Sequence, residues 1–334
     1  MKMSGARQVW LLPTLLLLLV VGFFAHLSIG KVPVDFITAL ANLFSDQQDP
    51  AILILQEIRF PRALLVILVG ATLGISGAAL QGLLRNPLAG PDLIGVTNCA
   101  ALGAVITLYT GIAATAWYVL PLGGMAGAFL SVTMIFFLAG RQAGAINLIL
   151  AGIAINALSS SLIALVLNFS HNPYAMNEII YWLLGSVSNR SFNEIWIALP
   201  FMVAGWVLLI FSRNFLDALT LGEETAKTLG FHPVREQILL VIGVSLCTGA
   251  AVSVSGSIGF IGLVVPHLMR PLVGNEPGKL LAVSALAGAI LLLAADSAVQ
   301  LLSVHQELKL GVVTAMIGGP FFLMLVYRMR NEVY

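Results

Sequence analysis

Long runs of residues without aspartate, glutamate, lysine or arginine recur along almost the whole of this chain of 334 residues. A helix that crosses the hydrocarbon core of a bilayer needs about 20 mainly apolar residues, and most of the runs match that length. Because the apolar residues are continuous and do not alternate with polar ones, the runs favour membrane-spanning helices over the strands of a β-barrel. The runs cover residues 9–30, 63–84, 93–140, 142–177, 195–212, 237–269, 280–295 and 310–327.

The composition supports the same class. Hydrophobic residues make up 59% of the chain and charged residues 9%, against roughly 25% charged residues in soluble domains. No soluble fold has enough interior to bury so much apolar surface, which excludes an extracellular domain and a cytosolic enzyme. The net charge of +1 gives no footprint for nucleic acid. Cys99 and Cys247 both lie inside apolar runs and are typical of small buried hydrophobes, not of a disulfide or a metal site.

We therefore predict an all-α polytopic membrane protein with about ten transmembrane helices, forming a single domain over residues 1–334. The run 93–140 is long enough for two helices, with a break near 110–116. The run 237–269 breaks at 255–257 into a full helix and a short one near 258–271. Residues 177–187 are expected to form a short interfacial helix.

The distribution of basic residues predicts the orientation. The first run follows Lys2 and Arg7 but ends without a small-x-small cleavage site, so we interpret it as a retained span and not as a signal peptide. With a cytoplasmic N-terminus, eleven of the 16 lysines and arginines fall on the inner side, as the positive-inside rule expects. Both termini are then cytoplasmic, in an inner membrane. Arg59 and Arg62 break the rule together on the outer side.

The polar residues inside the predicted spans could each have either of two roles. Asn156, Ser159 and Ser160 form a polar stripe in the fifth span, which either joins helices or lines a wet path. Asp296 is the one acid embedded in a span, and it is either a functional group or a member of a buried pair.

Several chemistries find no support. The spans carry no series of acids or histidines for proton coupling, and no Ser/His/Asp or zinc-ligand spacing is present. Residues 274–279 imitate a phosphate-binding loop but are one residue short, and Leu280 stands where serine or threonine is needed. If ATP drives this protein, the ATPase is another chain.

Five segments together resemble the FecCD-type permease subunits of ABC importers for iron-siderophore, haem and vitamin B12. They occur in the order of that family and extend over residues 58–330. The segments are 59–62 (RFPR), 85–92 (RNPLAGPD), 221–230 (LGEETAKTLG), 259–267 (GFIGLVVPH) and 311–315 (GVVTA).

The resemblance implies the fold of a type II ABC importer permease, with ten helices in each subunit. It also implies a set of partners: a second permease subunit, identical or paralogous, two cytosolic ATPases and a periplasmic substrate-binding protein. ATP and Mg²⁺ are then bound by the partner ATPase, and this chain is expected to hold no cofactor and no metal.

The resemblance also implies roles for the two ends of the pathway. The turn at Asn86 and Leu88 is expected to lie at its cytoplasmic mouth, with both residues as gate candidates. Asp92 is placed to cap the third span. At the outer side Arg59 and Arg62, three apart on one helical face, are expected to dock the binding protein.

The cytoplasmic loop at about 213–236 is expected to carry a coupling helix that meets the ATPase. Acids at the start of the helix and a lysine toward its end suit the macrodipole, and glycine followed by proline at 233 ends it. The helix is too short to be stable alone, so Ala226, Leu229 and Phe231 are expected to hold it by packing. Small Ala226 is also expected to let the partner's surface approach. The predicted residues are Glu223, Glu224, Ala226, Lys227, Leu229 and Gly230.

These observations predict a permease subunit of an ATP-driven importer that moves an iron(III) chelate from periplasm to cytoplasm. Import of haem or vitamin B12 by the same mechanism is the alternative. An ion-coupled secondary transporter would need paired intramembrane charges, and a membrane-embedded enzyme would need a cluster of Asp, His or Glu.

Overall fold

The computed structural model describes residues 5–30, 32, 50–140, 144–303 and 308–332. Helices account for the regular structure in these residues. They are α1 (Gly5–Ser28), α3 (Pro50–Ile54), α4 (Phe60–Leu83), α5 (Val96–Tyr109), α6 (Val119–Ala139), α7 (Ala145–Asn168), α8 (Pro173–Leu183), α9 (Phe192–Phe211), α10 (Arg213–Leu219), α11 (Glu223–Thr228), α12 (Pro233–Ser255), α13 (Ile261–Met269), α14 (Pro277–Leu302) and α15 (Leu310–Glu332).

By length and composition, eight helical segments in the described residues can cross a membrane. Two shorter apolar helices, Val96–Tyr109 and Ile261–Val273, lie where two further spans are predicted. The prediction of an all-α polytopic membrane protein is confirmed, and its count of about ten helices agrees with these eight long and two short segments.

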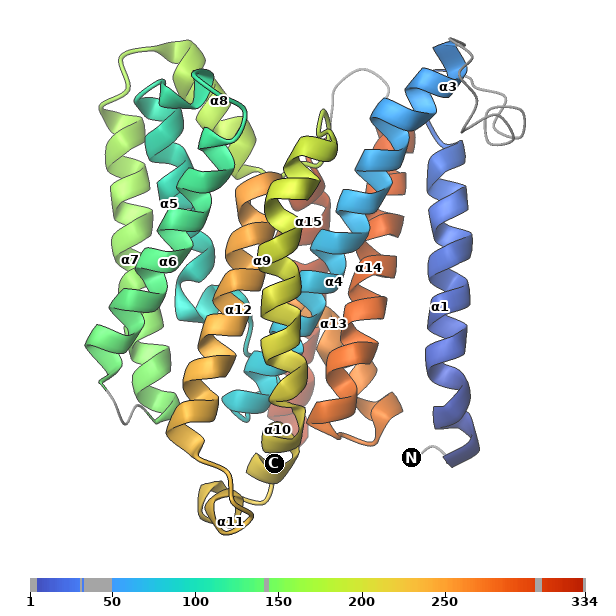
Figure 1. Cartoon of the computed structure of the whole chain (residues 1–334), viewed down its shortest axis with the longest axis vertical. Coiled ribbons are helices and arrows are strands. Elements are labelled where there is room, and N and C mark those ends of the chain that lie inside the picture. The colour runs from blue at the N-terminus through green and yellow to red at the C-terminus, as the bar shows by residue number, and fades with distance from the viewer. Residues whose placement is uncertain (1–4, 31, 33–49, 141–143, 304–307, 333–334) are drawn as a thin grey trace.

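The helices stand roughly side by side (Figure 1). α5, α6 and α7 contact one another at one edge, α4, α9, α12 and α14 run through the middle, and α1 lies at the other edge against α14. Both labelled chain ends lie at the end of the molecule that carries α11, while α3 and α8 lie at the opposite end. The orientation predicted from charge requires both termini to share one side, and this arrangement is compatible with it.

Two helices begin where the sequence supplies caps. The side chain of Asn172 accepts a hydrogen bond from the Tyr174 amide, and Pro173 takes the first helical position of α8. α9 begins with a capping box, in which the Ser191 amide donates to the Glu194 carboxylate at 2.8 Å. The interfacial helix therefore starts four residues before the predicted 177.

The break predicted at 255–257 is confirmed. α12 ends at Ser255, Gly256 has a φ of 70°, and α13 begins only at Ile261. A second irregular stretch separates α4 from α5 and contains a short 3₁₀ turn, Pro91–Ile94. These two irregular stretches, far apart in the sequence, approach each other in the fold and set the position of the candidate site.

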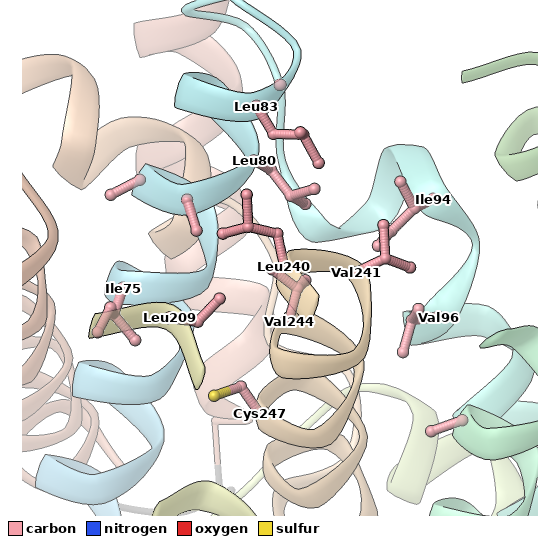
Figure 2. Packing of buried hydrophobic residues seen from close by; sticks show 14 of the residues in the cluster. Ile75, Leu80, Leu83, Ile94, Val96, Leu209, Leu240, Val241, Val244 and Cys247 are labelled. Atoms are coloured by element: carbon pink, nitrogen blue, oxygen red, sulfur yellow. The ribbon is translucent and has the colours of Figure 1, made fainter. Parts of the chain in front are cut away.

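Small residues bring the central helices into close contact. A β-carbon at Gly74 of α4 would overlap the Ser284 carbonyl of α14, and one at Gly127 of α6 would overlap the Cys99 carbonyl of α5. Such contacts replace the hydrophobic driving force that is missing between helices in lipid. Figure 2 shows the adjoining apolar cluster, in which Leu80, Leu209 and Leu240 come from α4, α9 and α12.

Candidate functional site

A cavity of about 180 Å³ lies where the two irregular stretches meet. The carbonyl of Leu93 packs against Gly152, which is seven residues inside α7, so the chain re-enters the helix bundle before α5 begins. Non-helical backbone at this depth is tolerated only where protein buries it or where it lines a water-filled space. The lining includes Leu88, Asp92, Thr97, Phe260, Leu263 and Phe322.

The two predicted gate residues play different parts in this cavity. Leu88 contributes to the lining. The side-chain oxygen of Asn86 accepts a hydrogen bond from the Leu88 amide at 2.9 Å. This is the local bond by which asparagine shapes a turn, so Asn86 positions the backbone that presents Leu88 to the cavity.

Asp92 does not have the expected position. α5 begins at Val96 with Gly95 as its N-cap, and no side chain caps that end. Asp92 lies one turn earlier, because the chain passes through the 3₁₀ turn and through a left-handed Gly95 before the helix starts. Asp92 is exposed and contributes to the lining of the cavity.

The three residues of the polar stripe in α7 differ in how far they are buried. Ser159 is buried, and its hydroxyl donates to the thiol sulfur of Cys99 at 3.3 Å. Ser160 is exposed and accepts a hydrogen bond from the Asn98 side chain at 2.8 Å. Asn156 is half-buried. The stripe therefore joins α7 to α5 through both Ser159 and Ser160, and Ser160 and part of Asn156 also remain exposed.

The side chain of Arg59 forms hydrogen bonds within this chain. It lies in a π-helical turn, Leu55–Arg59, just before α4, and is only 5% exposed. Its guanidinium group donates to the carbonyl of Leu27 at 2.9 Å and to that of Val32 at 2.6 Å. These bonds hold the segment that follows α1 against the start of α4.

Arg62 lies one turn further along and pairs with Asp296. Its Nε and Nη2 atoms donate to the two carboxylate oxygens of Asp296, each at 2.8 Å. His26 and Gln300 also contact Asp296, at 2.8 and 3.1 Å. The Arg62 side chain is 17% exposed and that of Asp296 is 1% exposed. The reading of Asp296 as a member of a buried pair therefore fits the structure, and the pair joins α1, α4 and α14.

A cavity of about 340 Å³ opens beside both arginines at this end of the molecule. Its polar lining includes Arg59, Arg62, Ser188, Asn189 and Gln300. The two arginines thus border one cavity, as their spacing predicts. Each already has partners within the chain, a feature that sequence spacing alone does not reveal.

The predicted coupling helix is present as α11, Glu223–Thr228, at the end of the molecule opposite α3 and α8 (Figure 1). Lys227 pairs with Glu224 at 2.7 Å, and this hydrogen bond raises the pKa of the lysine. Gly230 has a φ of 91°, the left-handed conformation expected of a residue that stops a helix. These features follow the sequence-based expectation closely.

Ala226 and Leu229 differ from each other in the surface that they offer. Ala226 is fully buried within the chain, so it does not leave open space for a partner. Its carbonyl accepts the Phe231 amide, and its methyl group holds α11 against the molecule. Leu229 is 59% exposed and is the apolar side chain that α11 presents outward. The packing expected of Ala226 is therefore present, but the open space expected beside it is absent, and Leu229 does not pack as expected.

Sequence reasoning missed two features of the site. α10 precedes α11, and its Asp217 accepts a hydrogen bond from the Gly278 amide at the start of α14, at 2.7 Å. Phe260 lines the cavity with a φ of 68°, although glycine is the residue expected there. Phe215 and Leu219, both buried and four residues apart, are the signal at helical spacing that could have revealed α10. Within the described residues no group of three or more His, Cys, Asp or Glu could hold a metal ion.

Comparison with known proteins gives consistent matches over nearly the whole chain. The profile of the FecCD transport family matches residues 17–328. The hemin transport system permease protein HmuU of Yersinia pestis is 36% identical over 322 residues, covering 95% of each chain. The Fe(3+) dicitrate transport system permease protein FecD of Escherichia coli K12 is 36% identical over 304 residues, covering 91% of this chain and 94% of its own.

Two further matches are a vitamin B12 permease and a solved transporter structure. The vitamin B12 import system permease protein BtuC of Salmonella typhi is 35% identical over 323 residues, covering 96% of this chain and 95% of its own. A solved structure of an inward-facing ABC transporter of the metal-chelate type superposes with a TM-score of 0.84 at 31% identity, covering 94% of this chain and 98% of that one.

Proposed function

This chain belongs to the FecCD transport family, and we propose from that membership that it is the permease subunit of an ABC importer for an iron(III) chelate. The observation that carries the proposal is the match over residues 17–328 to a family whose named members here import haem, ferric citrate and vitamin B12. The chain supplies the membrane pathway, and separate ATPases hydrolyse ATP.

The choice of an iron(III) chelate follows from the relatives that are named for ferric citrate. The cavity lining offers one carboxylate and one hydroxyl among mostly apolar side chains, which suits a bulky cargo of any of these kinds that passes through without being held. Haem and vitamin B12 are the alternative cargoes, because relatives of similar identity are named for them. The buried pairing of Asp296 argues against an ion-coupled transporter, which needs titratable groups that exchange their partners.

The pathway follows from the cavity and from α7. Leu88 narrows the passage at its inner mouth, and Asn86 fixes the turn that presents Leu88. Asn156 and Ser160 extend the wall along α7, supported by the packing contact of Ser159 with α5. Alternating access, in which ATP-driven closure of the partner ATPases rocks the helix bundles, changes the width of this mouth.

Docking of the substrate-binding protein takes place at the cavity beside Arg62. The exposed part of Arg62 offers positive charge there, while Arg59 shapes the rim by holding the segment after α1. Gln300 borders the same cavity and contacts Asp296 without adding charge. Of the two arginines predicted to dock the binding protein, Arg62 is therefore the one that offers an accessible charge.

Coupling to the ATPase takes place at α11. Glu223, Glu224 and Lys227 present an exposed charged surface around exposed Leu229, and buried Ala226 with left-handed Gly230 fixes the helix on the permease. The same side of the membrane then holds both termini, as the charge distribution predicts. The second permease subunit is a copy or a paralogue of this chain, and ATP and Mg²⁺ are bound by the ATPases.

The proposal is tested by co-expression with the cognate ATPase, purification and reconstitution with the cognate binding protein. We expect ATP hydrolysis to be stimulated by binding protein loaded with a ferric siderophore. Stimulation by haem or cobalamin alone would assign the alternative cargo. No association with an ATPase, together with uptake driven by a proton gradient, would contradict the proposal.

A further inference from the structure

Phe260 holds an unusual backbone conformation at the start of α13. Its φ is 68° and its ψ is −24°, in the left-handed region that bulky side chains rarely occupy. Its carbonyl accepts the Val264 amide at 2.8 Å and the Leu263 amide at 3.1 Å, so the strained residue is the one that begins the helix. Such strain persists only where the surrounding structure imposes it, and it gathers at functional sites.

The ring of Phe260 separates two cavities. One is the pathway cavity of about 180 Å³ described above. The other is a cleft of about 20 Å³ between α13, α14 and α15, and Phe260 lines both. The cleft is otherwise lined by Ile261, Val264, Leu291, Thr314, Ile317 and Gly318 among others. Removing the ring would join the two spaces.

The ring is seated in a notch on α15. A β-carbon at Gly318 would overlap the ring atoms of Phe260, so only glycine fits there, whereas a β-carbon at the next residue, Gly319, would meet nothing within 4 Å. Pro320 follows inside the same helix. Proline removes a backbone hydrogen bond and glycine lowers helix stability, so the notch coincides with the weakest point of α15.

We propose that Phe260 is a movable seal of the transport pathway, which closes the passage between the pathway cavity and the α13–α15 cleft while its ring occupies the notch at Gly318. Bending of α15 at residues 318–320 withdraws the notch, and the ring then leaves as the backbone relaxes out of its left-handed conformation. The inference rests on the proposed function, because it assigns a moving part to that pathway.

A cysteine in the cleft reports on the seal. Thr314 is 4% exposed and lines the cleft, and Cys99 and Cys247 are both buried, so Thr314→Cys can be studied with these two replaced by alanine. In the full-length chain in liposomes, we expect a water-soluble maleimide to react slowly with Thr314→Cys and several-fold faster when Phe260→Ala is added. Phe322→Ala is the matched control, because Phe322 lines the pathway cavity but not the cleft.

Equal labelling rates with and without the Phe260 ring would overturn the seal. In the complex with its ATPases, the labelling rate should also change between the nucleotide-free and the ATP-trapped states. Protection of Thr314→Cys in every state would overturn the movement. These rates are read without cargo, so a failure of cargo uptake by the unmodified complex would count against the proposed function and not against the seal.

A double-mutant cycle tests the notch independently of labelling. Gly318→Ala should lower the thermal midpoint and ATP-driven uptake, whereas the neighbouring Gly319→Ala should cost less because its β-carbon meets no atom. In the background of Phe260→Gly, which removes the β-carbon that Gly318→Ala would also overlap as well as the ring, Gly318→Ala should lose most of its effect. If Gly318→Ala is equally harmful with and without the Phe260 side chain, the contact between that side chain and the notch does not act as proposed.

Discussion

Arg62 on α4 and Asp296 on α14 form a two-bond ion pair across 234 residues of sequence, with both contacts at 2.8 Å. His26 of α1 reaches the same carboxylate. The helices α1, α4 and α14 are thereby fixed to one another near the end of the molecule that carries α3. Lipid offers no polar solvent to replace these contacts, so each partner depends on the others.

Removing one member of this pair should be strongly destabilising. Asp296→Asn leaves the Arg62 charge without a counter-charge, and breaking a buried pair on one side costs about 3–5 kcal/mol. We expect a clear fall in the thermal midpoint in detergent. The control is Lys279→Ala, because the pair of Lys279 with Glu276 is about half exposed at 56% and 49% and such pairs contribute about 0–1 kcal/mol. Equal effects of the two variants would show that the pair is not structural.

Uptake should depend on the side-chain oxygen of Asn86, which accepts the hydrogen bond from the Leu88 amide. Asn86→Asp keeps an oxygen at that position, whereas Asn86→Leu removes it and forfeits about 0.5–1.5 kcal/mol of turn stability. We therefore expect ATP-driven uptake to survive the first change and to fall with the second. Loss of uptake in both variants, with normal expression, would show that the amide nitrogen and not the turn is what matters.

The two serines of α7 should differ in reactivity. Ser160→Cys is expected to react with a membrane-impermeant thiol reagent, because residue 160 is exposed, and Ser159→Cys to resist it, because residue 159 is buried against Cys99. Labelling is measured in the complex in each nucleotide state. Reaction at 159 but not at 160 would reverse our assignment of the packing and pathway faces.

The outward surface of α11 should decide ATPase binding. Leu229→Asp places a charge on an exposed apolar side chain and should reduce copurification of the ATPase while leaving the thermal midpoint of the permease unchanged. Tyr174→Asp, on an 85% exposed residue at the opposite end of the molecule, is the control and should retain the ATPase. Full copurification with Leu229→Asp would exclude this helix as the contact.

Ala226→Trp should act differently from Leu229→Asp. The residue is fully buried, so a large side chain overpacks the contact that holds α11 on the permease, at a cost of about 1–3 kcal/mol. We expect both the thermal midpoint and ATPase retention to fall together. A stable permease that has lost only the ATPase would restore a direct role for residue 226 in the interface.

The spans could be predicted because a bilayer demands long charge-free runs, and charges interrupt this chain at matching intervals. The break after Ser255 was visible as Ser-Gly-Ser inside an apolar run. α11 was predictable from its acids, lysine and terminal glycine, since caps and macrodipole act locally. Each of these signals is contained in one short segment.

The contacts between distant segments could not be predicted in the same way. His26 and Asp296 lie 270 residues apart, and no local pattern indicates which span an embedded acid will face. Ala226 was expected to face a partner because exposure of a small residue cannot be read from its type. The left-handed Phe260 is imposed by tertiary packing against Gly318, against its own backbone preference.

We propose that this chain forms the membrane pathway of an ATP-driven importer of an iron(III) chelate. The most direct measurement is uptake of ⁵⁵Fe-labelled siderophore into proteoliposomes that contain the chain and its cognate ATPase, with loaded binding protein outside and ATP inside. We predict uptake that requires ATP and binding protein and that persists when a protonophore collapses the proton gradient. Uptake that is independent of ATP and abolished by the protonophore would contradict the account.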